Sequence, residues 1–236
     1  MIFVYIALFI TVLKKLKLDE SAFEKIRLSV KEAEQNTSGE IAVCLANESS
    51  DYSFWEFFAS TVAGILVFFC ALPFSSSLKK FYESENWLSP EWYIPLTFGV
   101  IYLLSVLIFF FLFNIPFFDR LVIPFSYKSR MVSKQAFSVF AQTGVYETEH
   151  HNGILIYVSY LERQVRIVCD KGISDKISDD LWKIIADSLA SDIAKGNAQE
   201  AFCDAIGKCG ELLKEHYPSE KENENELPDG LVILEN

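Results

Sequence analysis

Carboxylates are the side chains most able to build a chemical site in this chain, which has 32 Asp and Glu residues among 236 and a net charge of −11. Glu40, Asp170 and Asp229 stand at the expected start of one strand, at the expected end of another and in a motif near the carboxyl terminus. If they meet at one edge of a sheet, their oxygens can bind Ca²⁺ or Mg²⁺. No EF-hand spacing or DxD motif accompanies them, so helix capping and turn formation are the competing interpretation.

The cysteines and histidines follow no catalytic or metal-binding pattern. Five cysteines without a CxxC pair favour free thiols in a reducing compartment. His150 and His151 adjoin in a polar turn and His216 ends a helix, and none of them has the spacing of a helical zinc pair. We therefore expect the histidines to be solvated.

A serine nucleophile and a nucleotide site are also disfavoured. Ser159 lies in no G-x-S-x-G elbow, and Glu162 and Arg163 are expected to form a local ion pair or to set strand register. The glycines form neither a P-loop nor a dinucleotide fingerprint, and the acidic balance argues against a nucleic-acid surface. We assign no catalytic residue and no organic cofactor.

Two long apolar runs, residues 54–74 and 92–118, interrupt the rest of the chain. The first has no charge for 18 residues from Phe57 onward, and the second has none for 27 residues. Each can cross a bilayer core of roughly 30 Å at about 1.5 Å per residue, whereas soluble core helices are rarely so long without charge. The runs predict a transmembrane hairpin over residues 54–118, with spans at about 54–74 and 92–114. Its polar groups can bond between the helices or to a partner: Ser60, Thr61, Ser105 and Asn114.

The elements around the hairpin predict one α+β domain, a small mixed β-sheet covered by helices. Helical periodicity begins near Asp19 and precedes a strand at 40–46, and another helix follows the second span. The segments 153–159 and 164–170 are four residues apart, which predicts an antiparallel hairpin with one more exposed face. Two helices beginning near Ser178 and Asn197 close the domain, with a core stripe expected at Leu181, Ile184, Ile185 and Leu189 in the first of them.

These elements divide the chain into consecutive parts. Residues 1–18 form an apolar amino-terminal segment, interpreted as a short interfacial or anchoring helix or as residues upstream of the true start. Residues 19–53 and 119–217 are the two halves of the domain, and 218–236 are an acidic tail with a short apolar end. Four cations follow the second span, against two between the spans, which favours a cytoplasmic domain in a multi-pass protein of the cell membrane: Arg120, Lys128, Arg130 and Lys134, against Lys79 and Lys80.

The order of motifs resembles the TPM domain family, in its membrane-protein branch in which a two-span hairpin interrupts the domain. The matching segments are TSGEIAV at 37–43, Thr148 with NGILIYVS at 152–159, Glu162 and Arg163, DKGI at 170–173 and NELPD at 225–229. The resemblance implies a small mixed sheet covered by helices, often tethered to a membrane, and a role in maintaining or modulating membrane complexes. Acid phosphatase activity and divalent-metal binding are attributed to some members, and bacterial members of this branch mostly have no assigned function.

Two functions are therefore expected. In the first, the domain binds or modulates a membrane protein partner, without catalysis, while the hairpin lies in the lipid bilayer. In the alternative, the protein is a divalent-metal-dependent phosphatase in which Glu40, Asp170 and Asp229 hold the ion and bound water attacks the phosphate. Nucleic acid and nucleotides are expected partners in neither.

Overall fold

The computed structural model describes residues 11–35, 37–85, 90–147, 152–218 and 230–234. The chain forms two compact units, one made of Met1–Ser50 with Ser126–Asn236 and the other of Asp51–Phe125. The first unit is a four-stranded sheet covered by helices, and the second contains the two apolar helices. The mixed α and β architecture confirms the predicted fold class.

The sheet has the strand order β3-β2-β1-β4. β1 (Glu40–Ala46) pairs in parallel with β2 (Gly153–Ser159) on one side and with β4 (Leu231–Leu234) on the other, and β3 (Gln164–Cys169) pairs antiparallel with β2. The predicted β2–β3 hairpin is confirmed. The short apolar segment near the carboxyl terminus is an edge strand.

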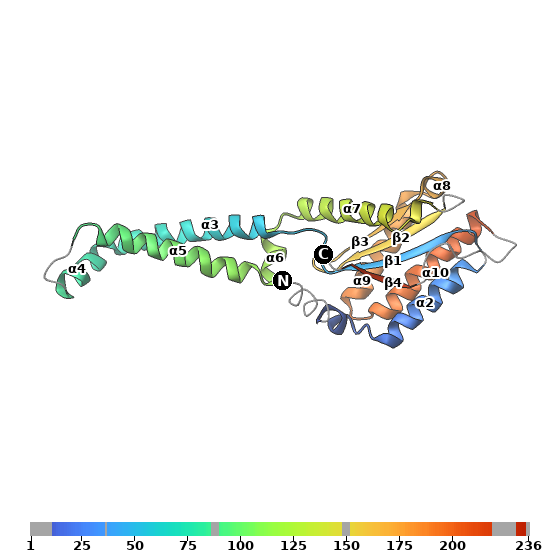
Figure 1. Ribbon diagram of the computed structural model, residues 1–236, viewed down its shortest axis with the longest axis horizontal. Coiled ribbons are helices and arrows are strands. Elements are labelled where there is room, and N and C mark those ends of the chain that lie inside the picture. Colours follow the sequence, from blue (N-terminus) through green and yellow to red (C-terminus); the bar gives the residue numbers. More distant parts are fainter. Residues whose placement is uncertain (1–10, 36, 86–89, 148–151, 219–229, 235–236) are drawn as a thin grey trace. The chain divides into compact units, whose positions relative to one another are not determined.

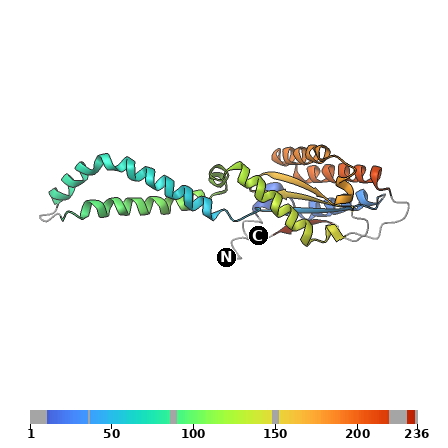
Figure 2. The same ribbon diagram turned by 90° about the horizontal axis from the view of Figure 1, so that it is seen from above.

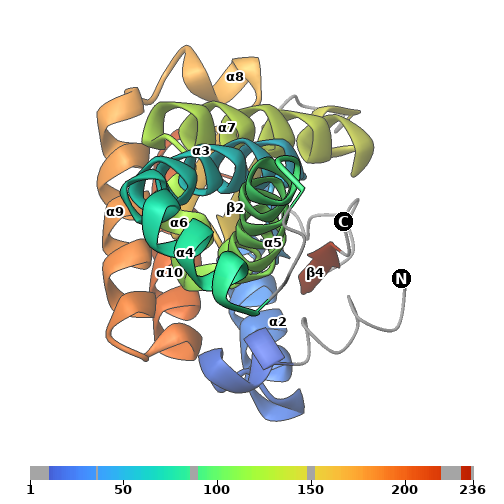
Figure 3. The same ribbon diagram turned by 90° about the vertical axis from the view of Figure 1, so that its left-hand side faces the viewer.

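Helices cover both faces of this sheet. On one face, α10 (Ala198–His216) contacts both α2 (Glu20–Glu34) and α9 (Asp179–Ala194) and lies between them (Figure 1). On the other face lies α7 (Phe125–Gln142), above the strands in Figure 1. α9 packs on β3 at one edge of the sheet while β4 forms the opposite edge, and Figure 3 shows them on opposite sides of this unit.

Strand alternation divides the buried side chains between two apolar clusters. Ile41, Val43 and Leu45 of β1 pack against the layer of α2, α9 and α10, whereas Ala42 and Cys44 face α7. β2 alternates in the same way, so both central strands are buried on both faces. The expectation of an exposed face on β3 is wrong for Val168, which is 6% exposed because α7 covers it.

Two other local expectations need correction. Leu181 and Ile184 were expected in the core, but α9 turns Trp182, Ile185, Ala186 and Leu189 inward and leaves Ile184 64% exposed. The bulky Trp182 indole at 5% exposure sets this phase. At the amino-terminal side, residues 11–16 are helical, and Val12, Leu16 and Leu18 are buried in the same core as α2. The sequence pattern did not indicate that packing.

The second unit is built on α3 (Ser53–Ala71) and α5 (Tyr93–Phe113), which run side by side in Figures 1 and 2. Glu56 contacts Asn114 near one end of the pair and Phe68 contacts Phe98 near the other, so the helices are antiparallel. Both are long and apolar enough to cross a membrane, and 11% of the residues in the apolar window of each are buried. They can form the inserted hairpin that the apolar runs predict.

Short helices flank the apolar pair. The helical path continues from α3 through a 3-10 turn at Leu72–Phe74 into α4 (Ser75–Glu85), a region expected to be a simple connection. α5 ends at Phe113, and α6 (Pro116–Val122) begins after Ile115, where Pro116 occupies the first turn of a new helix. Two brief helices complete the order of elements, η2 (Val145–Glu147) and α8 (Lys171–Ser174).

Candidate functional site

Glu40 and Asp170 approach the same end of the sheet from opposite sides of β2. Glu40 begins β1 opposite Gly153, and the backbone N–H of Asp170 donates to the Gly153 carbonyl at 3.0 Å, just beyond β3. Glu40 is 1% exposed. The Asp170 carboxylate accepts from the Lys171 N–H at 2.6 Å and caps the single turn of α8. The structure therefore gives Asp170 the capping role that competed with metal binding.

The third predicted ligand, Asp229, lies outside the described residues, as do His150, His151 and most of the NELPD motif. Within the described ranges, no group of three or more His, Cys, Asp or Glu side chains gathers as a metal site would require. The proposed site of Glu40, Asp170 and Asp229 stays a prediction.

Residues of the quoted motifs brace this end of the sheet. The Thr37 hydroxyl donates to the Tyr217 carbonyl at 2.7 Å and accepts from the Gly39 N–H at 3.0 Å. The Asn152 amide donates to the Ser38 carbonyl at 2.6 Å and so joins the segments that enter β1 and β2. A Cβ on Gly39 would lie 2.7 Å from a Leu213 methyl group, so the close approach of α10 requires glycine there. These motif residues therefore have a structural role.

A buried polar cluster lies at the opposite end of the sheet, and we name it the hydroxyl cluster: Ser49, Tyr157, Ser159 and Glu162. The Ser49 hydroxyl donates to Ser159 at 2.8 Å and lies 3.0 Å from the Tyr157 hydroxyl. Glu162 accepts from the Ser49 N–H at 2.8 Å and from the Ser159 hydroxyl. Each of the four residues is at most 6% exposed.

The hydroxyl cluster links two loops. It ties residues that follow β1 to the β2–β3 turn, because Ser49 belongs to the first and Glu162 to the second. Burial raises the pKa of the Tyr157 hydroxyl, so that group stays protonated. Glu162 thus fixes the turn through Ser49 and Ser159, in line with the expected role in setting strand register and not with the alternative of a local ion pair with Arg163.

Sequence reasoning missed the anchor of α7. The Arg166 guanidinium of β3 donates to Ser129 at 2.8 Å, to Ser133 at 3.2 Å and to the Gln164 side chain at 2.8 Å. Burial lowers the pKa of this guanidinium, which nevertheless stays charged. The available signal was the alternation of Gln164, Arg166 and Val168 together with Ser129 and Ser133 spaced four apart on a helix.

The Asn114 amide at the end of α5 donates to the Glu56 carboxylate near the start of α3 at 2.8 Å, which joins the two helices at one end of the pair. The other candidate groups bond within their own helices, Ser60 to the Glu56 carbonyl at 2.6 Å and Ser105 to the Ile101 carbonyl at 2.5 Å. Thr61 does the same with Phe57 at 2.9 Å. Of the four polar residues expected to form hydrogen bonds between the helices or to a partner, Asn114 forms one between the helices, and Ser60, Thr61 and Ser105 bond within their own helices.

The cysteines are free, as expected from their number and spacing. Burial raises the pKa of Cys44 and of Cys209 to about 12, which keeps both thiols neutral and unreactive at physiological pH. They are small apolar core residues, one on each face of the sheet.

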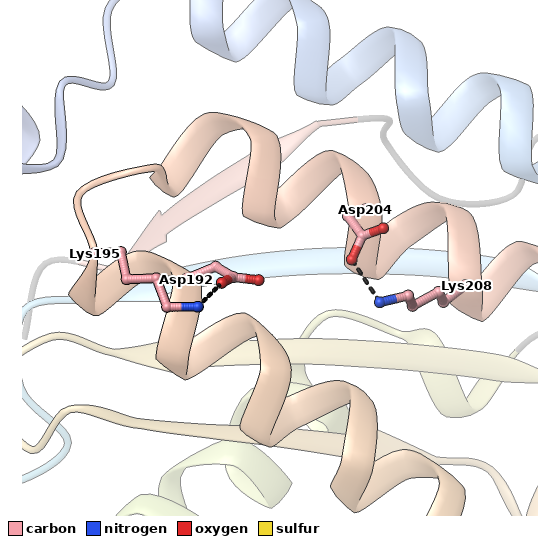
Figure 4. A network of polar contacts seen from close by, with 4 residues as sticks. All are labelled: Asp192, Lys195, Asp204 and Lys208. Carbon is pink, nitrogen blue, oxygen red and sulfur yellow. Dashed lines mark hydrogen bonds and ion pairs between the residues drawn. The ribbon is translucent and has the colours of Figure 1, made fainter.

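Charged pairs decorate the outer surface of α9 and α10 (Figure 4). Lys195 bonds Asp192 and Lys208 bonds Asp204, each at 2.7 Å, and each pair lies within one helix or its end. The Lys195 ammonium holds the pKa of Asp192 below its usual value. Exposed pairs of this kind stabilise a protein very little, and they form no concave site.

Comparisons with known proteins agree with the fold. Residues 122–212 match the model of the TPM domain, a stretch that includes all of α7, β2, β3, α8 and α9 and most of α10. The NMR structure of the BA42 protein from the psychrophilic bacterium Bizionia argentinensis is similar, with a TM-score of 0.54 and 22% identity over 92% of this chain and 95% of that one. The search of curated proteins found no match. The family match places a TPM domain within residues 122–212, and the solved structure shows a similarity of fold alone.

Proposed function

We propose that this protein is an integral membrane protein of two spans, α3 and α5, whose TPM domain binds or modulates a membrane-associated protein complex. The first unit is then a soluble module, and the second fixes it to the bilayer. This proposal assigns the protein to the membrane-protein branch that its sequence resembles.

The exposed apolar surface of α3 and α5 is the observation that carries this proposal. Phe57 is 58% exposed, Leu103 is 65% exposed and Phe111 is 66% exposed, whereas the polar Glu56 and Ser60 are buried at 6% and 0%. A surface of this kind is a liability in water but is what the hydrocarbon of a bilayer covers. A buried helix of a soluble core would hide these side chains.

The charge distribution supports a cytoplasmic TPM domain. Four cations follow the second span and two lie between the spans: Arg120 of α6 with Lys128, Arg130 and Lys134 of α7, against Lys79 and Lys80 of α4. The positive-inside rule counts such residues near the span ends. A membrane-impermeant thiol reagent applied to intact cells should label Ser77→Cys in α4 and should label Ser178→Cys only after lysis; the reverse pattern would overturn the orientation.

The TPM domain also offers an exposed apolar pair for a protein partner. Leu181 and Ile184 of α9 are 42% and 64% exposed, and they lie one helical turn apart on the same face. Large exposed aliphatic side chains near one another are frequent at interaction surfaces. They are the contact that we assign to the partner.

Cross-linking in native membranes tests the binding role. A photo-crosslinker at the exposed Asp187, one helical turn beyond Ile184, should yield one adduct of defined mass. Leu181→Glu with Ile184→Glu should abolish that adduct without unfolding the domain, because both side chains are exposed. Phe137→Glu is the matched control, since Phe137 is 63% exposed but lies on α7. No adduct from any position on α9 would argue against the role.

The metal-dependent phosphatase is the second candidate, favoured by one observation. Glu40 and Asp170 flank Gly153 at one end of the sheet, as the convergence of Glu40, Asp170 and Asp229 on Ca²⁺ or Mg²⁺ requires. The full chain in mild detergent should then bind the ion in calorimetric titration and hydrolyse a phosphomonoester, and Asp170→Asn should remove both. Titration without heat, or equal hydrolysis by the variant, would exclude this candidate.

A further inference from the structure

A cavity of about 260 Å³ opens at the end of the sheet that carries the β2–β3 turn. Its apolar wall comes from Leu16, from Val158 and Val165 on facing strands, and from Ala190 and Ile193 of α9. Val158 and Val165 are partners in the β2–β3 register, so the wall is continuous. The cavity therefore has a rigid apolar floor supplied by three separate parts of the chain.

The charges at this cavity are of one sign. Lys15 and Arg163 line it, and no described residue that lines it is acidic. The lining of this cavity is thus positively charged, although the chain as a whole has a net charge of −11. Within the described ranges, neither cation has an ion pair or a side-chain hydrogen bond, so both are available to an external anion.

The backbone holds Arg163 in an unusual conformation. Its φ is +53°, in the left-handed region that glycine or asparagine normally occupies in such turns. The hydroxyl cluster fixes the turn through Glu162, the residue before it. Arginine at this position has a conformational cost that glycine would remove.

Backbone hydrogen bonds close the last turn of α9, which borders the cavity. The N–H groups of Lys195, Gly196 and Asn197 bond the carbonyls of Ser191, Ile193 and Asp192, which closes the helix. Asp192, the nearest acidic residue on this helix, bonds Lys195. A cavity lined by two cations and by apolar side chains thus fits an anion that carries an apolar group.

We propose that this cavity binds the headgroup and adjoining acyl region of an anionic phospholipid. The inference rests on the proposed function, because that places a bilayer next to the domain. Ala46, at this end of β1, is seven residues before the first residue of α3, a length of chain that spans at most roughly 25 Å. The cavity is therefore within reach of a membrane surface, where anionic lipids are concentrated.

Native mass spectrometry of the full chain in a maltoside detergent tests the site. Phosphatidylglycerol is titrated and the apparent Kd of the first adduct is measured, with phosphatidylcholine and glycerol 3-phosphate as separate ligands. Lys15→Gln and Arg163→Gly should each weaken the first phosphatidylglycerol adduct about five-fold, and together about 25-fold, since each removes one cation near the anion. Ala194→Leu, which places a larger side chain at an exposed position of the lining, should also weaken it.

The controls separate a specific site from general charge. Lys14→Gln removes a neighbouring exposed cation that does not line the cavity and should leave the Kd unchanged. Equal loss with Lys14→Gln, no loss with Arg163→Gly, or equal affinity for phosphatidylcholine would overturn the inference. Glycerol 3-phosphate binding as tight as that of the lipid would overturn the lipid assignment in favour of a free phosphate ester.

Membrane retention is measured on the same wild-type chain by alkaline carbonate extraction. A chain that carbonate releases but that still binds lipid through Lys15 and Arg163 contradicts the proposed function and supports this site. A chain that stays in the membrane without such binding contradicts this site alone.

Discussion

The two units of the chain differ in the side chains that they bury: the first buries large apolar side chains, whereas the second exposes them. In the unit that contains the TPM domain, called the TPM unit below, Phe202, Ile156 and Leu45 are 0% exposed, and the buried Glu162 is hydrogen-bonded. In the hairpin, Leu103 and Ile108 are 65% and 64% exposed, while the polar Ser60 is at 0%. Under the proposed function, this difference means that the first unit is built for water and the second for hydrocarbon.

Hydroxyl groups follow the same division. In the hairpin, Ser60, Thr61 and Ser105 donate to carbonyls of their own helix. In the TPM unit, Ser49 donates to Ser159 and so joins the segment after β1 to the end of β2. These hydroxyl groups form tertiary contacts in the TPM unit and bonds within one helix in the hairpin.

The largest expected effect comes from truncating a core aromatic of the TPM unit. Phe202→Ala should lower the unfolding free energy of that unit by about 3–5 kcal/mol, through lost burial and a cavity, because Phe202 is fully buried in α10. Hydrogen exchange of β1 and β2 amides in the full chain measures the change. Phe111→Ala in the hairpin is the control and should leave those amides unaffected; similar losses from both would erase the distinction between the units.

A charged side chain in the middle of α5 should impair membrane insertion of the hairpin, whereas the same charge on a water-exposed surface would be tolerated. Leu103→Arg is expected to cost about 2.5–3.5 kcal/mol of membrane insertion, because an exposed side chain at mid-span faces lipid. The fraction of protein in the membrane pellet after expression measures it. Better solubility with normal folding would indicate that Leu103 faces water.

The seam of the hairpin depends on close approach at Gly64. A Cβ there would lie 2.6 Å from a methyl group of Val106, so Gly64→Leu should separate the helices at a cost of about 1–3 kcal/mol. Oxidation of a Phe68→Cys, Phe98→Cys pair in a Cys70→Ser background reports the separation, since these rings are 5.9 Å apart. Gly99→Ala is the control because nothing lies within 4 Å of its added carbon. Undiminished cross-linking in the Gly64 variant would show that the helices do not meet there.

The smallest effect is expected on the charged surface of the TPM unit. Lys208→Ala removes the exposed pair with Asp204 and should change the unfolding free energy by less than about 0.5 kcal/mol. The same amide exchange measures it. A loss comparable to that of Phe202→Ala would mean that surface charge, not core burial, holds this unit together.

Periodicity predicted the regular elements because burial dominates their energy. The helix expected to begin near Asn197 is present as α10, with Phe202, Ile206, Cys209 and Leu213 buried, and the β2–β3 hairpin is confirmed. In α9 the prediction selected Leu181 and Ile184, because hydropathy alone did not weigh the size of Trp182. β4 was missed as a strand, since four apolar residues after an acidic stretch carry no pairing information.

The candidate site was less predictable, because contacts between distant segments decide it. Strand ends brought Glu40 and Asp170 to one end of the sheet as expected, but Asp170 caps α8. The pairing of Glu162 with Ser49, 113 residues away, had no local signal. The placement of Lys15 and Arg163 around one cavity also had no local signal, because the cavity forms only when three separate segments pack together.

Alkaline carbonate and urea extraction of native membranes tests the central claim most directly, that α3 and α5 lie in lipid. The account predicts that the full chain stays in the membrane pellet through both washes, because lipid covers the exposed apolar surfaces of the two helices. Release of the chain into the supernatant would show that something other than a bilayer covers those surfaces and would contradict the account.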